Sequence, residues 1–170
     1  MITSTPVQTF KRILVILTAC VLQLTCAFVF AADNGVSAEL HAFKVVSGAN
    51  GQKLVATSDA LPGDTIEYQV TYRNAGAAPA RDVLATLPVP TGGMAYVDDS
   101  ATPAKVQASL DGKQYAPVPL TRNVVRDGKQ VTETVPVAEY RFLRWQLGEL
   151  APGRSVTVSS RMRLDGASKQ

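Results

Sequence analysis

The chain has 170 residues, of which 46% are apolar and 18% are charged. This length predicts one domain, and the glycine and proline content is too low for a disordered chain. Lys11 and Arg12, two of the 17 basic residues, precede a long apolar run, which leaves 15 basic residues against 14 acids from residue 33 onward. This balance excludes a strongly basic nucleic-acid binder, so we expect no nucleic-acid partner.

The first 32 residues are typical of a secretory signal. Lys11 and Arg12 supply the basic part, residues 13–30 carry no charge, and two alanines precede Asp33. This order of basic, apolar and small residues predicts a signal peptide over residues 1–32.

Cleavage is expected after one of the two alanines, Ala31 or Ala32. A cut after Ala31 places Val29 at the −3 position, whereas a cut after Ala32 places the bulkier Phe30 there. The first of these is the better substrate, and the mature protein is expected to begin at Ala32 or Asp33.

Two alternatives to cleavage stay open. About 20 apolar residues span a bilayer, so residues 13–32 could remain as a membrane anchor. The run Leu17-Thr18-Ala19-Cys20 resembles a bacterial lipobox, which would make Cys20 a lipidated first residue, although the residues after Cys20 stay mostly apolar. In all three cases the folded part is exported to the periplasm, the cell surface or the extracellular space. It meets a membrane only through residues 13–32, if they are uncleaved or lipidated.

Residues 33–170 are expected to form a single β-sandwich domain. Both cysteines, Cys20 and Cys26, lie in the apolar run, so the mature chain has no disulfide. Its length suffices for a core, because a domain near 150 residues buries roughly 68–70% of its unfolded surface.

The mature chain reads as short strands separated by turns. The clearest strand is 65–73, in which β-branched and aromatic residues alternate with polar ones. No stretch has a helical period, so we expect an all-β antiparallel sandwich. In chain order the predicted strands are 37–46, 53–56, 65–73, 81–87, 94–97, 106–110, 113–118, 123–126, 129–134, 140–147 and 155–164.

Two Asp-Gly pairs predict two-residue hairpin turns, because both central positions of such turns need a positive φ. They are Asp111-Gly112 and Asp127-Gly128. The last two predicted strands are joined by residues 148–154 and are also expected to pair as a hairpin.

Five runs of residues follow a known pattern. They are Gly63-Asp64-Thr65-Ile66-Glu67-Tyr68, Val70-Thr71-Tyr72-Arg73-Asn74-Ala75-Gly76, Ala80-Arg81-Asp82-Val83, Leu87-Pro88 and Leu147-Gly148-Glu149-Leu150-Ala151-Pro152-Gly153. Together they resemble the conserved-repeat domain of bacterial surface proteins, catalogued as a domain of unknown function (number eleven). The resemblance covers roughly residues 61–164 and implies an immunoglobulin-like sandwich of the cell envelope, with no shared catalytic residues to carry over.

The chain departs from that family's pattern in three ways. The acid often found just before the Leu-Pro pair is absent, since Ala85 and Thr86 stand there. Residues 100–140 carry extra hairpins. The sequence contains one copy of a domain that often occurs in tandem arrays.

No residue pattern predicts catalysis, a metal site or a cofactor. His41 is the single histidine, and nothing near it in sequence would orient it as a general base. Asp98-Asp99 is an isolated acid pair, whereas calcium takes six to eight oxygen ligands. We therefore expect a protein that is not an enzyme.

A face with exposed aromatic rings and guanidinium groups is predicted on the last two strands. Trp145 alternates in phase with Leu143 and Leu147, which predicts that these three side chains point inward. Pairing the two strands then gathers the outward side chains on one face, where cation–π contacts are expected. They are Tyr140, Phe142, Arg144, Arg161 and Arg163. Two further interpretations are a solvated sheet face and a face covered by the extra hairpins.

The sequence thus predicts an exported, non-enzymatic structural or protein-interaction module of the bacterial cell envelope. The alternative is a surface binding protein for polysaccharide or another envelope ligand. Its partner is expected to be an envelope protein or a glycan.

The signal prediction can be checked by mass. The intact mass of the protein from its native envelope should correspond to a chain that begins at Ala32 or Asp33. A mass that includes residues 1–31 would exclude cleavage, and a diacylated Cys20 would establish lipidation instead.

Overall fold

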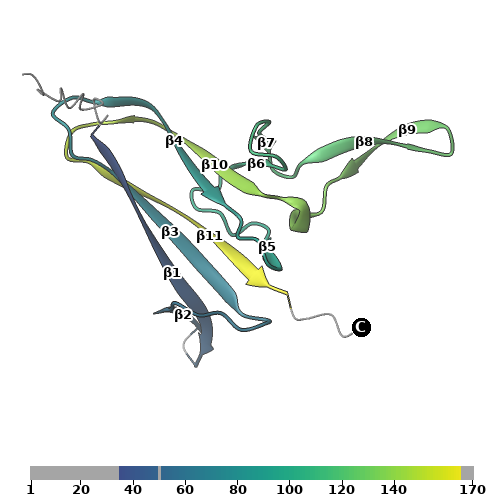
Figure 1. Cartoon of the computed structure of the whole chain (residues 1–170), viewed down its shortest axis with the longest axis horizontal. Coiled ribbons are helices and arrows are strands. Elements are labelled where there is room, and N and C mark those ends of the chain that lie inside the picture. The colour runs from purple at the N-terminus through teal and green to yellow at the C-terminus, as the bar shows by residue number, and fades with distance from the viewer. Residues whose placement is uncertain (1–34, 50, 166–170) are drawn as a thin grey trace, which may run out of the picture. The chain divides into compact units, whose positions relative to one another are not determined.

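The computed structural model describes residues 35–49 and 51–165 (Figure 1). The predicted cleavage and lipidation positions, Ala31, Ala32 and Cys20, lie outside this part. The described residues form antiparallel strands and one short 3₁₀ turn, η1 (Val137–Glu139). None of them belongs to a helix long and apolar enough to cross a membrane. The predicted all-β class with antiparallel sheets is confirmed.

The first sheet contains five strands in the order β2-β1-β3-β11-β5. Their bounds are β1 (Val36–Gly48), β2 (Gly51–Ala56), β3 (Thr65–Asn74), β5 (Met94–Tyr96) and β11 (Ser155–Leu164).

The second sheet contains four strands in the order β4-β10-β6-β7, and a separate pair forms the hairpin β8–β9. The bounds in the second sheet are β4 (Ala80–Pro88), β6 (Gln107–Ser109), β7 (Ala116–Pro117) and β10 (Phe142–Leu150). The hairpin consists of β8 (Thr121–Arg126) and β9 (Lys129–Thr134).

The core lies between the two sheets, and both of them contribute to it in a sandwich-like arrangement. Trp145 and Leu143 of β10 are buried, as their alternation predicts, and they belong to one cluster with Val158 and Met162 of β11. The Trp145 ring also donates a hydrogen bond from Nε1 to the carbonyl oxygen of Pro103 at 2.8 Å. Burying so large a ring costs little polar solvation when its N–H has a partner.

The predicted pairing of the last two strands is wrong. β10 lies in the second sheet beside β4, whereas β11 lies in the first sheet between β3 and β5. Gly148 and Leu150 continue β10 past the predicted strand end, with register shifts at Gly148. Only residues 151–154 are left to connect the strands, and this short link crosses from one sheet to the other.

Asn74 fixes that crossing. Its side chain is fully buried and donates from Nδ2 to the carbonyl oxygens of Ala78 (2.9 Å) and Leu150 (2.8 Å). Its Oδ1 accepts the N–H of Gly76 at 2.9 Å. Its backbone N–H donates to the Arg154 carbonyl oxygen, and its carbonyl oxygen accepts the N–H of Gly153. One residue therefore binds both the link from β3 to β4 and the link from β10 to β11.

The two Asp-Gly pairs have different outcomes. Asp127-Gly128 forms the predicted two-residue turn, with φ of 52° and 75° and with Arg126 paired to Lys129. Asp111-Gly112 does not, because β6 and β7 are shorter than predicted and pair Gln107 with Pro117 across a longer loop.

Substitution of Asn74 should therefore destabilise the whole fold. Asn74→Ala leaves two carbonyl oxygens and one N–H without their partner, and we expect a loss of about 2–4 kcal/mol in the free energy of unfolding. Asn74→Asp keeps the acceptor for Gly76 but sets a carboxylate oxygen against two carbonyl oxygens, so at pH 7 it should cost at least as much. Urea denaturation measures both, and a loss below about 1 kcal/mol for Asn74→Ala would contradict this role.

Candidate interaction surface

The five residues of the predicted contact face do not lie together. Arg161 and Arg163 lie on the outer side of the first sheet, while Phe142 and Arg144 belong to the second sheet. Arg161 is held in place by Glu67, whose Oε2 lies 2.9 Å from its Nε, and by Gln52, whose Oε1 lies 2.7 Å from its Nη1. The prediction failed because it required β10 and β11 to pair.

Tyr140 was predicted to be exposed but is 1% exposed. It precedes β10, at the end of η1, so the alternation of that strand does not apply to it. Its ring stacks on Tyr96 with centroids 6.0 Å apart, and its hydroxyl accepts the N–H of Leu120 at 2.9 Å. Tyr140 thus ties the core to the base of the hairpin β8–β9.

Phe142 is half-buried because a loop covers it. Residues 110–115 fold back over the outer side of the second sheet, and a Cβ added to Gly112 would lie 2.9 Å from the Phe142 ring. Asp111 holds the loop in shape: its Oδ1 accepts the N–H groups of Lys113 (2.8 Å) and Gln114 (3.0 Å). These two N–H groups, that of Gln114 above all, hold the pKa of Asp111 below its ordinary value. These hydrogen bonds hold the Asp-Gly pair in a covering loop over Phe142 rather than in a tight turn.

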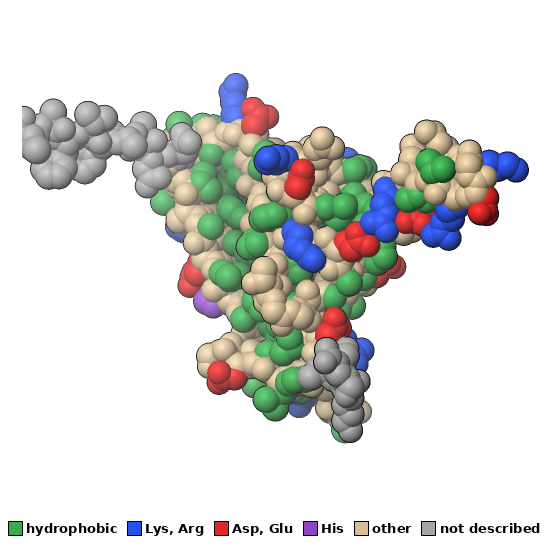
Figure 2. Space-filling view, turned by 45° about the vertical axis from the view of Figure 1, so that its right-hand side comes forward, with side chains coloured by type: hydrophobic (Ala, Val, Ile, Leu, Met, Phe, Trp, Pro, Cys, Tyr) green, Lys and Arg blue, Asp and Glu red, His purple; other side chains and the backbone are tan. Residues whose placement is uncertain are grey.

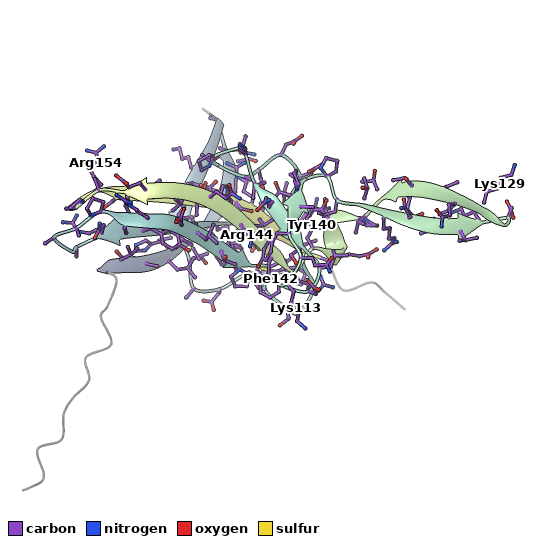
Figure 3. All side chains as sticks on the ribbon, turned by 90° about the horizontal axis from the view of Figure 1, so that it is seen from above. Lys113, Lys129, Tyr140, Phe142, Arg144 and Arg154 are labelled. Atoms are coloured by element: carbon purple, nitrogen blue, oxygen red, sulfur yellow. The ribbon has the colours of Figure 1, made fainter. Side chains whose placement is uncertain are left out.

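Arg144 is the cation of this surface. Its guanidinium lies 3.7 Å from the centroid of the Tyr115 ring and donates from Nη2 to Oε1 of Gln107 at 3.0 Å. Figure 3 shows Arg144, Phe142 and Lys113 close together on this side of the molecule. Beside Arg144 is a hollow of about 250 Å³ that Lys105 and Trp145 also line. In the described part of the chain neither Lys105 nor Arg144 forms an ion pair.

A second hollow, of about 320 Å³, is lined by Tyr115. Leu110 and Asp111 line it from the covering loop, and Leu120 and Arg122 line it from the base of the hairpin. This hollow therefore leads from Tyr115 to the base of the hairpin.

The hairpin β8–β9 extends away from both sheets (Figure 1). Val125 and Val131 are 68% and 40% exposed. The cross-strand register divides its side chains into two faces. The charged face comprises Arg122, Val124, Arg126, Lys129, Val131 and Glu133. The uncharged face comprises Thr121, Asn123, Val125, Gln130, Thr132 and Thr134. In Figure 2 the charged side chains gather along the lower side of this arm.

An ion-pair network stiffens the hairpin at its base. Arg122 lies 2.8 Å from Glu133 and 2.7 Å from Glu139 of η1, and Arg126 lies 2.7 Å from Glu133. The hydrogen bond from Arg122, supported by Arg126, lowers the pKa of Glu133. The network joins the hairpin to η1, next to Tyr140.

The residues weighed for catalysis and metal binding lie apart from this surface. His41 is on the outer side of the first sheet with Glu39 Oε1 3.1 Å from its Nε2. Asp98 and Asp99 sit in an exposed turn. Among the described residues, no three His, Cys, Asp or Glu side chains gather as metal ligands.

The projection of the hairpin β8–β9 from the surface does not follow from the residue pattern. The turn and both strands were predicted, but their projection was not. The available signal was composition: neither face of residues 121–134 carries the run of apolar residues that packing on a sheet requires.

The two Asp-Gly glycines allow a matched test of the covering loop. Gly112 and Gly128 have φ of 76° and 75°, but a Cβ meets Phe142 only at Gly112 and nothing within 4 Å at Gly128. Gly128→Ala should cost about 1 kcal/mol for the left-handed backbone. Gly112→Ala should cost about 1–3 kcal/mol more in urea denaturation, because the ring must also give way.

A double-mutant cycle separates the two terms. In a Phe142→Ala background the penalties of Gly112→Ala and Gly128→Ala should become equal. Equal penalties in the parent chain would mean that the loop does not rest on Phe142.

Comparison with known proteins gives no family model, no curated protein and no solved structure that matches this chain. The resemblance to the conserved-repeat domain therefore stays a prediction from the residue pattern. The function has to be argued from the surface described above.

Proposed function

We propose that this protein is a non-catalytic interaction module of the bacterial cell envelope and that the hairpin β8–β9 is its contact element. One observation carries the proposal. In the described part of the chain the hairpin pairs with no third strand, and most of its side chains on both faces are exposed. An isolated two-stranded hairpin is marginally stable in water. A hairpin held out from the core in this way is suited to complete its packing on a partner.

The envelope location rests on the signal-like residues 1–32. We also infer that the sandwich is a variant of the immunoglobulin-like class. Without the edge strands β2 and β7, its sheet orders are β1-β3-β11-β5 and β4-β10-β6, which match by position the two sheets of that class. The chain order differs. In that class the strands at the positions of β11, β10 and β6 follow one another along the sequence in this order, whereas in this protein β6 comes first and β11 last. Sandwiches of related architecture vary in this respect.

The placement of charged groups supports a non-catalytic role. Glu67 binds Arg161, Asp64 binds Lys44 at 2.8 Å, and Asp111 binds backbone N–H groups. The Lys44 ammonium lowers the pKa of Asp64. Each of these carboxylates has a structural partner. The Ser109 hydroxyl, which donates to Asp111 at 3.0 Å, is buried and accepts the N–H of Gly112 at 2.9 Å, so it too holds the covering loop in shape.

The surface around Arg144 favours a second candidate, the binding of an acidic glycan. Arg144 and Lys105 border one hollow without a carboxylate partner among the described residues, and Tyr115, which the Arg144 guanidinium contacts, lines the other. Planar guanidinium groups bind carboxylates well.

The proposed contact element can be tested in the envelope. A photo-reactive amino acid at Thr132, on β9, should give a cross-linked protein adduct on irradiation of native envelopes. The same photo-reactive amino acid in place of His41, whose side chain is 53% exposed on the first sheet, should give no protein adduct. Denaturing electrophoresis measures both.

Equal adduct formation at both positions, or none at Thr132, would contradict the proposal. If the partner is instead an acidic glycan, Thr132 gives no protein adduct. In that case Arg144→Met reduces retention on an acidic polysaccharide matrix, while Arg126→Met does not.

A further inference from the structure

The outer edge of β9 has its hydrogen-bonding groups free. The N–H of Val135 donates to the carbonyl oxygen of Leu120 at 2.8 Å, which identifies this pair as hydrogen-bonded. Hydrogen-bonded pairs alternate along an antiparallel ladder, so the backbone N–H and C=O groups of Val131 also point toward β8. The N–H and C=O groups of Gln130 and Thr132 then point away from β8. No strand within residues 35–49 and 51–165 pairs with them.

We propose that β9 pairs with β9 of a second copy of this chain, antiparallel, with Val131 of one copy opposite Val131 of the other. This inference rests on the proposed function, since it names the partner of the same contact element. The pairing lets Gln130 of each copy exchange hydrogen bonds with Thr132 of the other, so that the free groups of both edges are satisfied.

Charge selects this register. In a two-fold symmetric antiparallel pair of strands, directly opposite side chains lie on the same face of the sheet, so one residue lies opposite its own copy at the centre. For the two β9 strands to overlap, this central residue must be 130, 131 or 132. Centring on Val131 sets Lys129 opposite Glu133 of the second copy, twice. Centring on Gln130 sets Lys129 opposite Val131, and centring on Thr132 sets Glu133 opposite Val131. Only the register centred on Val131 opposes unlike charges.

The edge of β8 lacks this complementarity. It carries Arg122 and Arg126 and no acid, so no pairing of β8 with itself brings opposite charges together. Like charges placed directly across a ladder are unfavourable. Charged side chains usually protect an exposed edge from pairing, and those of β8 do so here. The charged side chains of β9 favour strand pairing only in the register centred on Val131.

The proposed pair gives both hairpins what they lack alone. Two hairpins joined at β9 form a four-stranded sheet, and three or more strands are the usual condition for independent stability. Val124 and Val131 of both copies form one apolar row across its charged face, since they are direct neighbours within each hairpin. The contact is short, so the association is transient and is best detected by trapping.

Disulfide trapping distinguishes the register. Opposite residues of a non-hydrogen-bonded pair have Cα atoms about 4.5 Å apart, which a disulfide can bridge. Under mild oxidation the full-length Val131→Cys protein should form a disulfide-linked dimer. Val125→Cys is the matched control, because it is more exposed but lies on β8 and on the other face. All variants retain Cys20 and Cys26, and the parent chain measures their background.

A charge swap tests the complementarity. In the Val131→Cys background, Lys129→Glu turns two attractive contacts into repulsive ones and should lower the dimer yield by about tenfold. Glu133→Lys should do the same. Mixing these two variants should restore the yield, because every opposed pair is again of unlike charge.

Two outcomes would overturn the inference. One is a Val131→Cys yield no higher than that of Val125→Cys, and the other is mixing that restores nothing. The proposed function fails separately: it survives if Thr132 cross-links to a different protein while Val131→Cys stays monomeric, and it fails if Thr132 gives no adduct.

Discussion

The amide of Asn74 holds together two of the links between the sheets. The chain passes from β3 to β4 after this residue and from β10 to β11 before Ser155, and the same side chain binds the carbonyl oxygens of Ala78 on the first of these links and Leu150 on the second. A planar amide offers two donors and one acceptor at fixed angles, so both links must pass through one point. The pairing of β3 with β11 and of β4 with β10 follows, because each pair of strands has ends at that point.

This constraint explains what the sequence could and could not predict. The phase of a strand depends on neighbouring residues, and Leu143 and Trp145 point inward as their alternation predicts. The choice of partner strand depends on contacts between residues far apart in the chain, such as the hydrogen bond between Asn74 and Arg154. The link after β10 therefore resembled a hairpin loop in sequence, although it crosses between the sheets.

The candidate surface was predictable to a similar extent. Arg144 is on the outer side of its strand, as predicted, but Phe142 lies beneath the loop around Gly112, and Tyr140 lies in the core. The same Asp-Gly dipeptide makes a tight turn at residues 127–128 and a covering loop at 111–112. The difference lies in the aromatic ring below the second loop, which belongs to a strand about 30 residues later and leaves no local signal.

Ion pairs hold the base of the hairpin β8–β9 in place, while the outer edge of β9 has no partner strand in the described part of the chain. The charges at the base explain how both features occur together. Arg122 and Arg126 hold the pKa of Glu133 below its ordinary value, so their contacts are fully present above the pKa of an unfolded glutamate, about 4.3. They are lost only as the pH falls through the lower value of the folded protein. Arg122 also lies 2.7 Å from Glu139, which joins the base to η1. These contacts engage side chains of the charged face, whereas the backbone groups of the β9 edge take no part in them. The arm can thus hold its direction without using the backbone groups that a partner strand needs.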